Sequence, residues 1–121
     1  MKNKIYNLKN RTYIYALEII KFLEILPRDY VSQTIGRQLL RSATSIGANI
    51  IEAQVLSSRK DFSNFYRHSL KSSNESKFWL ALLKDSNKAP ADKVEPVLAE
   101  TNEIANILAA SILTIKRKNN F

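Results

Sequence analysis

A wide apolar pattern runs through residues 32–56, a segment that contains no proline. At the helical repeat of about 100° per residue, its apolar positions cover roughly half of the circumference. This arc is wider than one buried stripe needs, so the segment is predicted to be a central helix. We expect it to contact its own bundle on one side and a second copy of the chain on the other. The remaining sector is a polar stripe that consists of Thr34, Gln38, Arg41, Ser45, Asn49 and Glu52.

Both glycines of the protein, Gly36 and Gly47, lie in this segment on nearly the same side. A glycine inside a helix costs about 1 kcal/mol relative to alanine. We interpret both positions as places where the backbone of another helix approaches closely. The alternative is a neutral glycine on the surface.

Three further segments have helical periodicity, at residues 11–26, 61–87 and 92–118. Pro27 ends the first of them, because proline disfavours the helical conformation of the residue before it. Proline is tolerated best in the first turn of a helix, so a later start of the last helix, near Glu95, is the alternative to a start at residue 92. Predicted N-caps are Ser32 for the second helix and either Ser58 or Asp61 for the third. In the first helix, the predicted core side consists of Tyr13, Ala16, Leu17, Ile20 and Leu23.

Four amphipathic segments joined by short connections predict an all-α, up-down-up-down four-helix bundle. The chain of 121 residues forms one domain, 1–121, with a loose basic arm at residues 1–10. Two glycines and three prolines are too few for a turn-rich β protein.

Serines occupy the middle of the core side of the third helix, between aromatic residues and leucines. Small hydroxyl side chains allow close helix approach and need partners when they are buried. The polar stripe of residues 32–56 supplies such partners, so we favour a buried polar network that fixes register and assembly. A ligand site along the same stripe is the alternative interpretation. The predicted network comprises Arg41, Ser45, Asn49, Glu52, Ser72, Ser73 and Ser76.

The residues of catalysis and metal binding are nearly absent from the sequence. No cysteine is present, and His68 is the only histidine, without the neighbours of a catalytic triad. The acids form no metal-binding pattern, and no glycine-rich loop could hold a phosphate. We therefore expect no enzymatic activity, no cofactor and no metal. No apolar window is long enough to span a membrane, and the N-terminus lacks a signal-peptide pattern, so we expect a cytoplasmic protein.

The net charge of +8 is concentrated at one end of the predicted bundle. The start of the first helix, the second connection and the end of the last helix meet there, and Asp61 is the only acid among them. A field of this sign suits a phosphate backbone, whereas the alternative is that lysine-rich ends only aid solubility. The cations at this end are Lys2, Lys4, Lys9, Arg11, Arg59, Lys60, Lys116, Arg117 and Lys118. We predict nucleic-acid contacts from Lys9, Arg11, Arg59, Lys60, Lys116, Arg117 and Lys118.

The central stretch resembles the bacterial four-helix-bundle family that includes the 23S rRNA intervening-sequence proteins. Three positions depart from the family pattern, namely Ala53, Ser69 and Lys71. The matching residues are Arg41-Ser42-Ala43, Ser45-Ile46, Asn49-Ile50 and Glu52, then Ser58, Phe62, Phe65, Ser72, Asn74-Glu75, Leu80 and Lys84-Asp85.

This resemblance implies a homopentameric ring without established enzymatic activity. A related branch of the family serves diversity-generating retroelements as an accessory protein that binds nucleic acid and a reverse transcriptase. Two alternative functions are therefore expected. One is nucleic-acid binding through the basic end, to RNA or DNA, and the other is a scaffold that docks a protein such as a reverse transcriptase.

Overall fold

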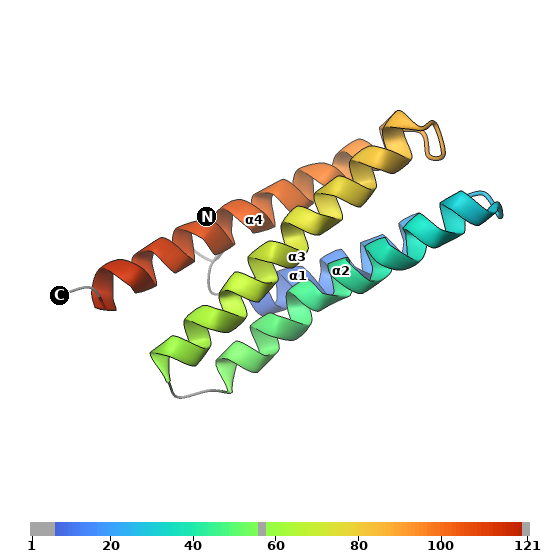
Figure 1. Ribbon diagram of the computed structural model, residues 1–121. Helices are drawn as coiled ribbons and strands as arrows, with labels where there is room; N and C mark the ends of the chain where they lie inside the picture. The colour runs from blue at the N-terminus through green and yellow to red at the C-terminus, as the bar shows by residue number, and fades with distance from the viewer. Residues whose placement is uncertain (1–6, 56–57, 120–121) are drawn as a thin grey trace.

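The computed structural model describes residues 7–55 and 58–119, without the side chains of Arg59 and Asn119. This part of the chain is all-α and contains no strand. It forms four long helices, and Figure 1 shows that they alternate in direction along the bundle. They are α1 (Leu8–Leu23), α2 (Tyr30–Gln54), α3 (Arg59–Asp85) and α4 (Ala91–Asn119).

Each helix packs on the next one in the chain, and α4 returns to α1, which closes the four-helix bundle. The α2–α3 interface is the most extensive, whereas α1 and α4 touch over a short stretch only. The core between the helices is mainly aliphatic, with the aromatic rings of Tyr15, Phe22 and Tyr66 and several buried serines and threonines. Its largest fully buried side chains are Leu8, Tyr15, Ile19, Leu39, Ile46, Ile50, Leu80, Leu83, Ile104 and Leu108.

Two side chains cap the starts of the central helices, as helix N-termini require for their free N–H groups. Asp29 accepts a hydrogen bond from the backbone N–H of Ser32 at 2.8 Å, so the predicted cap at Ser32 is wrong. The Ser32 hydroxyl instead donates to the second carboxylate oxygen of Asp29 at 3.0 Å. At the start of α3, Ser58 accepts from the N–H of Asp61, which resolves the choice left open by the sequence.

The predicted helix boundaries are displaced by one to three residues. α1 begins at Leu8, which is buried, so residues 8–10 belong to a helix and not to the predicted arm, whereas residues 1–6 lie outside the described residues. α4 begins at Ala91 and keeps Pro96 inside it, so the alternative start near Glu95 is wrong. Near the start of α4 the lost N–H of Pro96 removes one bond of an exposed turn only.

The core side of α1 differs from the predicted one. Tyr13 is 63% exposed, Leu17 47% and Ile20 45%, so these side chains face away from the core. Most of the α1 circumference is apolar, and periodicity alone could not select the buried side. The buried side is marked by two polar residues with internal partners, Thr12 and Tyr15.

Gly36 and Gly47 both face α1. A Cβ atom at Gly36 would lie 3.0 Å from Leu26 Cδ1, and one at Gly47 would lie 3.1 Å from Thr12 Oγ1. The Cβ at Gly47 would also lie 3.7 Å from the backbone carbonyl carbon of Thr12, so the close backbone approach predicted there is present, and α1 belongs to the same chain. At Gly36 the nearest atoms are the side-chain ends of Leu26 and Leu23, so the backbone approach predicted there is wrong. A contact of α2 with a second copy stays a prediction.

Candidate nucleic-acid interface

Of the cations predicted at the basic end, Lys60 lies near the start of α3, and Lys116, Arg117 and Lys118 lie near the end of α4. Figure 1 shows the end of α4 and the start of α3 at the same end of the bundle. Lys2, Lys4 and the side chain of Arg59 lie outside the described residues. No ion-pair partner is found, within residues 7–55 and 58–119, for the exposed side chains of Lys9, Lys60, Lys116, Arg117 and Lys118.

Arg11 does not belong to this set of unpaired cations. Its guanidinium donates from Nε and Nη2 to the two carboxylate oxygens of Glu100 on α4, at 2.7 and 2.9 Å, and Glu103 lies 3.5 Å away. The hydrogen bond to Glu100 raises the pKa of Arg11 above its ordinary value, although partial burial opposes the shift. The sequence counted Asp61 as the only acid at this end, but these carboxylates come from the middle of α4. Arg11 therefore joins α1 to α4, and we expect it to contribute less to nucleic-acid binding than the unpaired cations.

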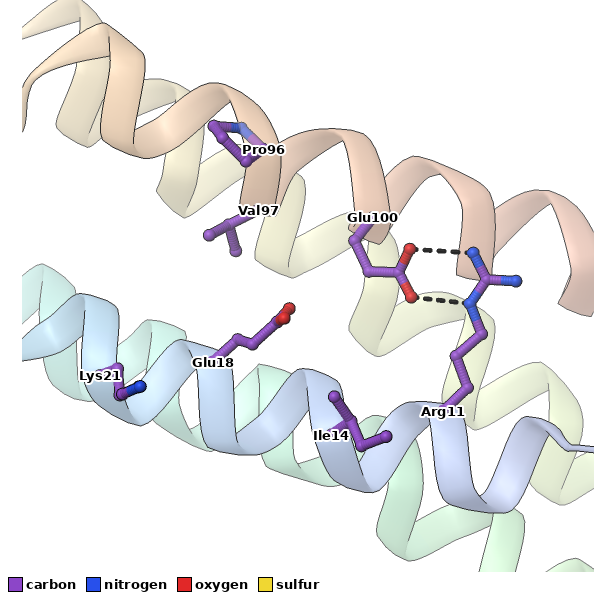
Figure 2. A pocket seen from close by; sticks show the side chains of 7 residues that line it. All are labelled: Arg11, Ile14, Glu18, Lys21, Pro96, Val97 and Glu100. Atoms are coloured by element: carbon purple, nitrogen blue, oxygen red, sulfur yellow. Dashed lines mark hydrogen bonds and ion pairs between the residues drawn. The ribbon is translucent and has the colours of Figure 1, made fainter.

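This ion pair lies at one end of a pocket between α1 and α4, with a volume of about 550 Å³. Figure 2 shows Arg11 and Glu100 facing each other across the pocket, with Pro96 and Val97 further along α4. The guanidinium of Arg11 and the carboxylate of Glu100 satisfy each other, and Glu18 and Lys21 place one further charge of each sign on the lining. Its lining residues are Arg11, Ile14, Glu18, Lys21, Pro96, Val97 and Glu100.

Two exposed cations in the first half of α3 were missed by the sequence analysis. Arg67 and Lys71 have no ion-pair partner in the described part of the chain. They continue the basic end along α3 toward the middle of the bundle. The signal was available, because Lys60, Arg67 and Lys71 are spaced by seven and four residues and so share one face of a helix. The assignment of all charge to the end of the bundle obscured this spacing.

The polar network between α2 and α3 is present, but with partly different members. The hydroxyls of Ser42 and Ser76 lie 2.8 Å apart, and Ser69 donates to the backbone carbonyl of Ile46 at 2.8 Å. All three serine side chains are fully buried. Ser42 and Ser69 were missing from the predicted network, because Ser42 had been left off the polar stripe and Ser69 was not paired with a backbone acceptor.

The outer layer of the predicted network is not buried. Arg41 and Glu52 are both exposed, so their assignment as buried ends of the network is wrong. Arg41 pairs across the surface with Glu75 of α3. Long charged side chains on the outward edge of a helix remain in water at little cost. The other predicted members have hydrogen-bond partners within the two helices. Asn49 Nδ2 donates to the Ser45 hydroxyl at 2.9 Å, and the Ser72 hydroxyl donates to the Ser45 hydroxyl at 3.1 Å. The Ser73 hydroxyl donates to the Ser69 carbonyl at 3.0 Å, and the Ser76 hydroxyl donates to the Ser72 carbonyl at 2.9 Å.

A polar pocket of about 360 Å³ opens on the surface above this network. The geometry of this pocket is compatible with the alternative interpretation of the polar stripe as a ligand site. His68 lies in it with an exposed side chain and an edge-on contact to Phe65, at 6.3 Å between ring centroids. The pocket is lined by Arg41, Ser45, Asn49, Phe65, His68, Lys71, Ser72 and Glu75.

Metal ligands do not gather anywhere in residues 7–55 and 58–119, where no group of three His, Asp or Glu side chains could hold an ion. None of the helices in that part of the chain is both long and apolar enough to cross a membrane.

The helical pattern and the fold agree with one known protein family. The family model of the 23S rRNA-intervening sequence protein matches residues 4–110. The chain belongs to this family. A solved structure from the S23 ribosomal protein family, a Bacteroides thetaiotaomicron protein of unknown function, is 33% identical in sequence. The similarity covers 90% of this chain and 97% of that one, with a TM-score of 0.83. No curated protein shows significant similarity to the chain.

Proposed function

We propose that this member of the intervening-sequence family is a non-enzymatic, homo-oligomeric protein that binds nucleic acid through its basic end. The observation that carries the proposal is the group of Lys60, Lys116, Arg117 and Lys118, which are exposed and lack ion-pair partners among the described residues. They come from two helices that meet at one end of the bundle (Figure 1). Cations in such a group bind phosphates and release counterions, largely without regard to sequence.

Self-association is the second element of the proposal. Large apolar side chains are exposed along the outer sides of α1 and α2. The antiparallel contact that places Thr12 beside Gly47 brings these two sides level with each other. An apolar surface on neighbouring helices suits a second copy of the chain, and the family resemblance favours a pentamer. This surface consists of Tyr13, Leu17, Ile20, Leu40 and Ile51.

Assembly and charge support each other in this proposal. In a ring, the basic ends of all protomers would lie on one side, and their fields would add. The family description refers to 23S rRNA, which makes RNA the first nucleic acid to test. Nucleic acid and further copies of the chain are both available in the cytoplasm, where we place the protein.

The proposal is tested by nucleic-acid binding as a function of salt, together with light scattering for the mass. Replacing Lys116, Arg117 and Lys118 by glutamine should weaken binding of unrelated RNA and DNA sequences about equally. The slope of log affinity against log salt should fall by about 0.7 to 0.9 per lost phosphate contact. A matched control replaces three exposed cations at the other end, Arg28, Lys21 and Lys93, and should change the slope much less.

Three results would each contradict part of the proposal. Wild-type protein that binds neither RNA nor DNA at low salt would remove the nucleic-acid function and leave the scaffold alternative, such as docking of a reverse transcriptase. A scattering mass equal to one protomer at micromolar concentration would remove the oligomer. Equal losses from the two triple variants would assign binding to overall charge instead of the basic end.

A further inference from the structure

A row of polar and basic side chains follows the outer face of α3. Its members recur at intervals of four and three residues, so they stand above one another on one side of the helix. At 1.5 Å per residue, the row extends about 20 Å from the basic end toward the middle of the bundle. All members are exposed, and none of its cations pairs with an acid in the described part of the chain. The row consists of Lys60, Asn64, Arg67, Lys71 and Asn74.

An apolar groove lies directly beside this row, between α3 and α4. Its volume is about 600 Å³, within the range of about 300–1,000 Å³ that is common for small-molecule sites. Arg67, Lys71 and Asn74 form its α3 rim. Leu113 of α4 is 54% exposed there and adds apolar surface to the groove. The apolar lining residues are Leu70, Ala109, Ile112 and Leu113.

The charge of this groove distinguishes it from the α1–α4 and α2–α3 pockets described above. Glu18 and Glu100 line the α1–α4 pocket, and Glu75 lines the α2–α3 pocket. The residues that line the α3–α4 groove include two cations and no carboxylate. The exposed cations at the end of α4 begin three residues after Leu113, one helical turn away. An occupant of the groove is therefore expected to combine negative charge with apolar surface.

We propose that the α3–α4 groove receives bases of single-stranded nucleic acid while Lys60, Arg67 and Lys71 hold its phosphates. This inference rests on the proposed function and specifies its substrate class. A duplex stacks its bases inside the helix and presents phosphates to such a surface, whereas a single strand exposes both phosphates and base faces. Proteins that bind single strands without sequence preference pair a basic track with aromatic side chains on which the bases stack. In this groove the aliphatic side chains of Leu70, Ile112 and Leu113 would take that position. Here the track and the apolar surface adjoin along α3.

The test compares three ligands of equal length by fluorescence anisotropy with the full-length protein. They are a thymidine oligonucleotide, an abasic strand that keeps only sugar and phosphate, and a DNA duplex. Wild-type protein should bind the thymidine strand most tightly. Leu113→Ser should weaken that complex by about fivefold and leave the other two unchanged, because a half-exposed leucine would lose its contact with a base. Val31→Ser is the matched control, since Val31 is 47% exposed at the other end of the bundle.

The phosphate track has its own test. The double variant Arg67→Gln and Lys71→Gln should weaken binding of both single strands. It should also lower the salt slope by about 0.7 per lost contact. Replacing Lys21 and Lys93 by glutamine is the control with the same charge change. Unchanged melting temperature and scattering mass in every variant would show that fold and assembly are intact.

The outcomes separate the inference from the proposed function. If the thymidine and abasic strands bind equally well, or if Leu113→Ser behaves like Val31→Ser, the groove receives no bases, although phosphate binding at the basic end would stand. If polyglutamate displaces the abasic and thymidine strands equally and binds more tightly than either, the groove serves an acidic polypeptide and the inference is overturned. If none of the three ligands binds, the proposed function fails as well.

Discussion

The hydroxyl of Ser42 on α2 lies 2.8 Å from the hydroxyl of Ser76 on α3, and neither side chain is exposed to solvent. Ser76 also donates to the backbone carbonyl of Ser72 at 2.9 Å. Each hydroxyl has one proton, so Ser42 is the donor to Ser76 when Ser76 donates to Ser72. The two helices are thus joined by hydrogen bonds at a point where larger side chains would hold them apart, and with Ser42 as the donor these bonds run in one direction, from Ser42 through Ser76 to Ser72.

This direction predicts unequal effects of two alanine substitutions. In Ser42→Ala, Ser76 keeps its bond to Ser72, so we expect a loss of about 0.5–1 kcal/mol in unfolding free energy. In Ser76→Ala, Ser42 keeps only a 3.3 Å contact with the carbonyl of Leu39, and we expect a loss of about 1–2 kcal/mol. Urea denaturation of both variants measures the difference. Equal losses would show that the chain has no fixed direction.

The two glycines of α2 should respond differently to alanine. At Gly36 the new Cβ meets the end of the flexible Leu26 side chain, which can move, so the gain in helix propensity of up to about 1 kcal/mol should largely offset the contact. At Gly47 the neighbour is Thr12, whose hydroxyl is fixed by a 2.9 Å bond to the Leu8 carbonyl.

Thermal melting should therefore rank Gly47→Ala below Gly36→Ala in stability. Gly47→Leu should lose about 1–3 kcal/mol or more through overpacking against α1. Wild-type stability in Gly47→Leu would mean that α1 can move away from α2 without cost.

The bond between Arg11 and Glu100 should contribute to stability and not to nucleic-acid binding. Glu100→Gln should lower unfolding free energy by about 1 kcal/mol at low salt, since the pair is bidentate and about three-quarters shielded from solvent. Glu95→Gln is the control, because its pair with Lys84 lies at the surface and should matter little.

Because Arg11 pairs with Glu100, Arg11→Gln should change nucleic-acid affinity by less than about twofold. The variant with glutamine at positions 116, 117 and 118 should lose much more affinity. Anisotropy titrations of the two variants at one salt concentration provide this comparison. A large loss from Arg11→Gln would return Arg11 to the binding surface.

Tyr15 predicts a loss of stability in alkali. Burial raises the pKa of Tyr15 from 10.0 to about 12, although hydrogen bonds with Thr101 and Ser76 oppose the shift. Between these two values the unfolded chain is ionised at this tyrosine and the folded chain is not. Stability should therefore fall as the pH rises above 10 and level off above about 12.

Urea denaturation across this pH range measures the effect, with Tyr15→Phe as the comparison. Tyr66 also has a raised pKa because it is buried, so the variant should retain part of the slope and lose the rest. At neutral pH the same variant should lose about 1 kcal/mol, because Thr101 keeps its 2.8 Å bond to the Val97 carbonyl. An unchanged alkaline slope in Tyr15→Phe would contradict the assignment.

The helices of this protein could be predicted from sequence because hydrophobic periodicity is strong and breakers are few. Which side of a helix is buried could not always be predicted. α1 is apolar around most of its circumference, so the exposed Tyr13 and Ile20 looked as suitable for the core as the buried Tyr15 and Ile19. The distinguishing contact, from Tyr15 to Thr101 at 2.6 Å, joins residues far apart in the chain.

The candidate site was partly predictable for a related reason. Charge could be assigned to one end of the bundle from topology alone, and Lys60 and Lys116 are exposed there. Pairing depends on how two helices are rotated against each other, so the partner of Arg11 could not be known. The position of Arg67 beside an apolar groove also required the packed α3–α4 pair.

The short contact between α1 and α4 has a consequence for exchange between protomers. α1 is held mainly by α2, whereas α3 has extensive contacts with both of its neighbours. Local opening follows the least stabilised element, so the amides of α1 should lose hydrogen-exchange protection before those of α3. An α1 that detaches in this way leaves behind a vacant site on its own bundle. In an oligomer, the α1 helix of an adjacent protomer would fit the same site. Exchange of this one helix between protomers is therefore the expected route to a domain-swapped assembly.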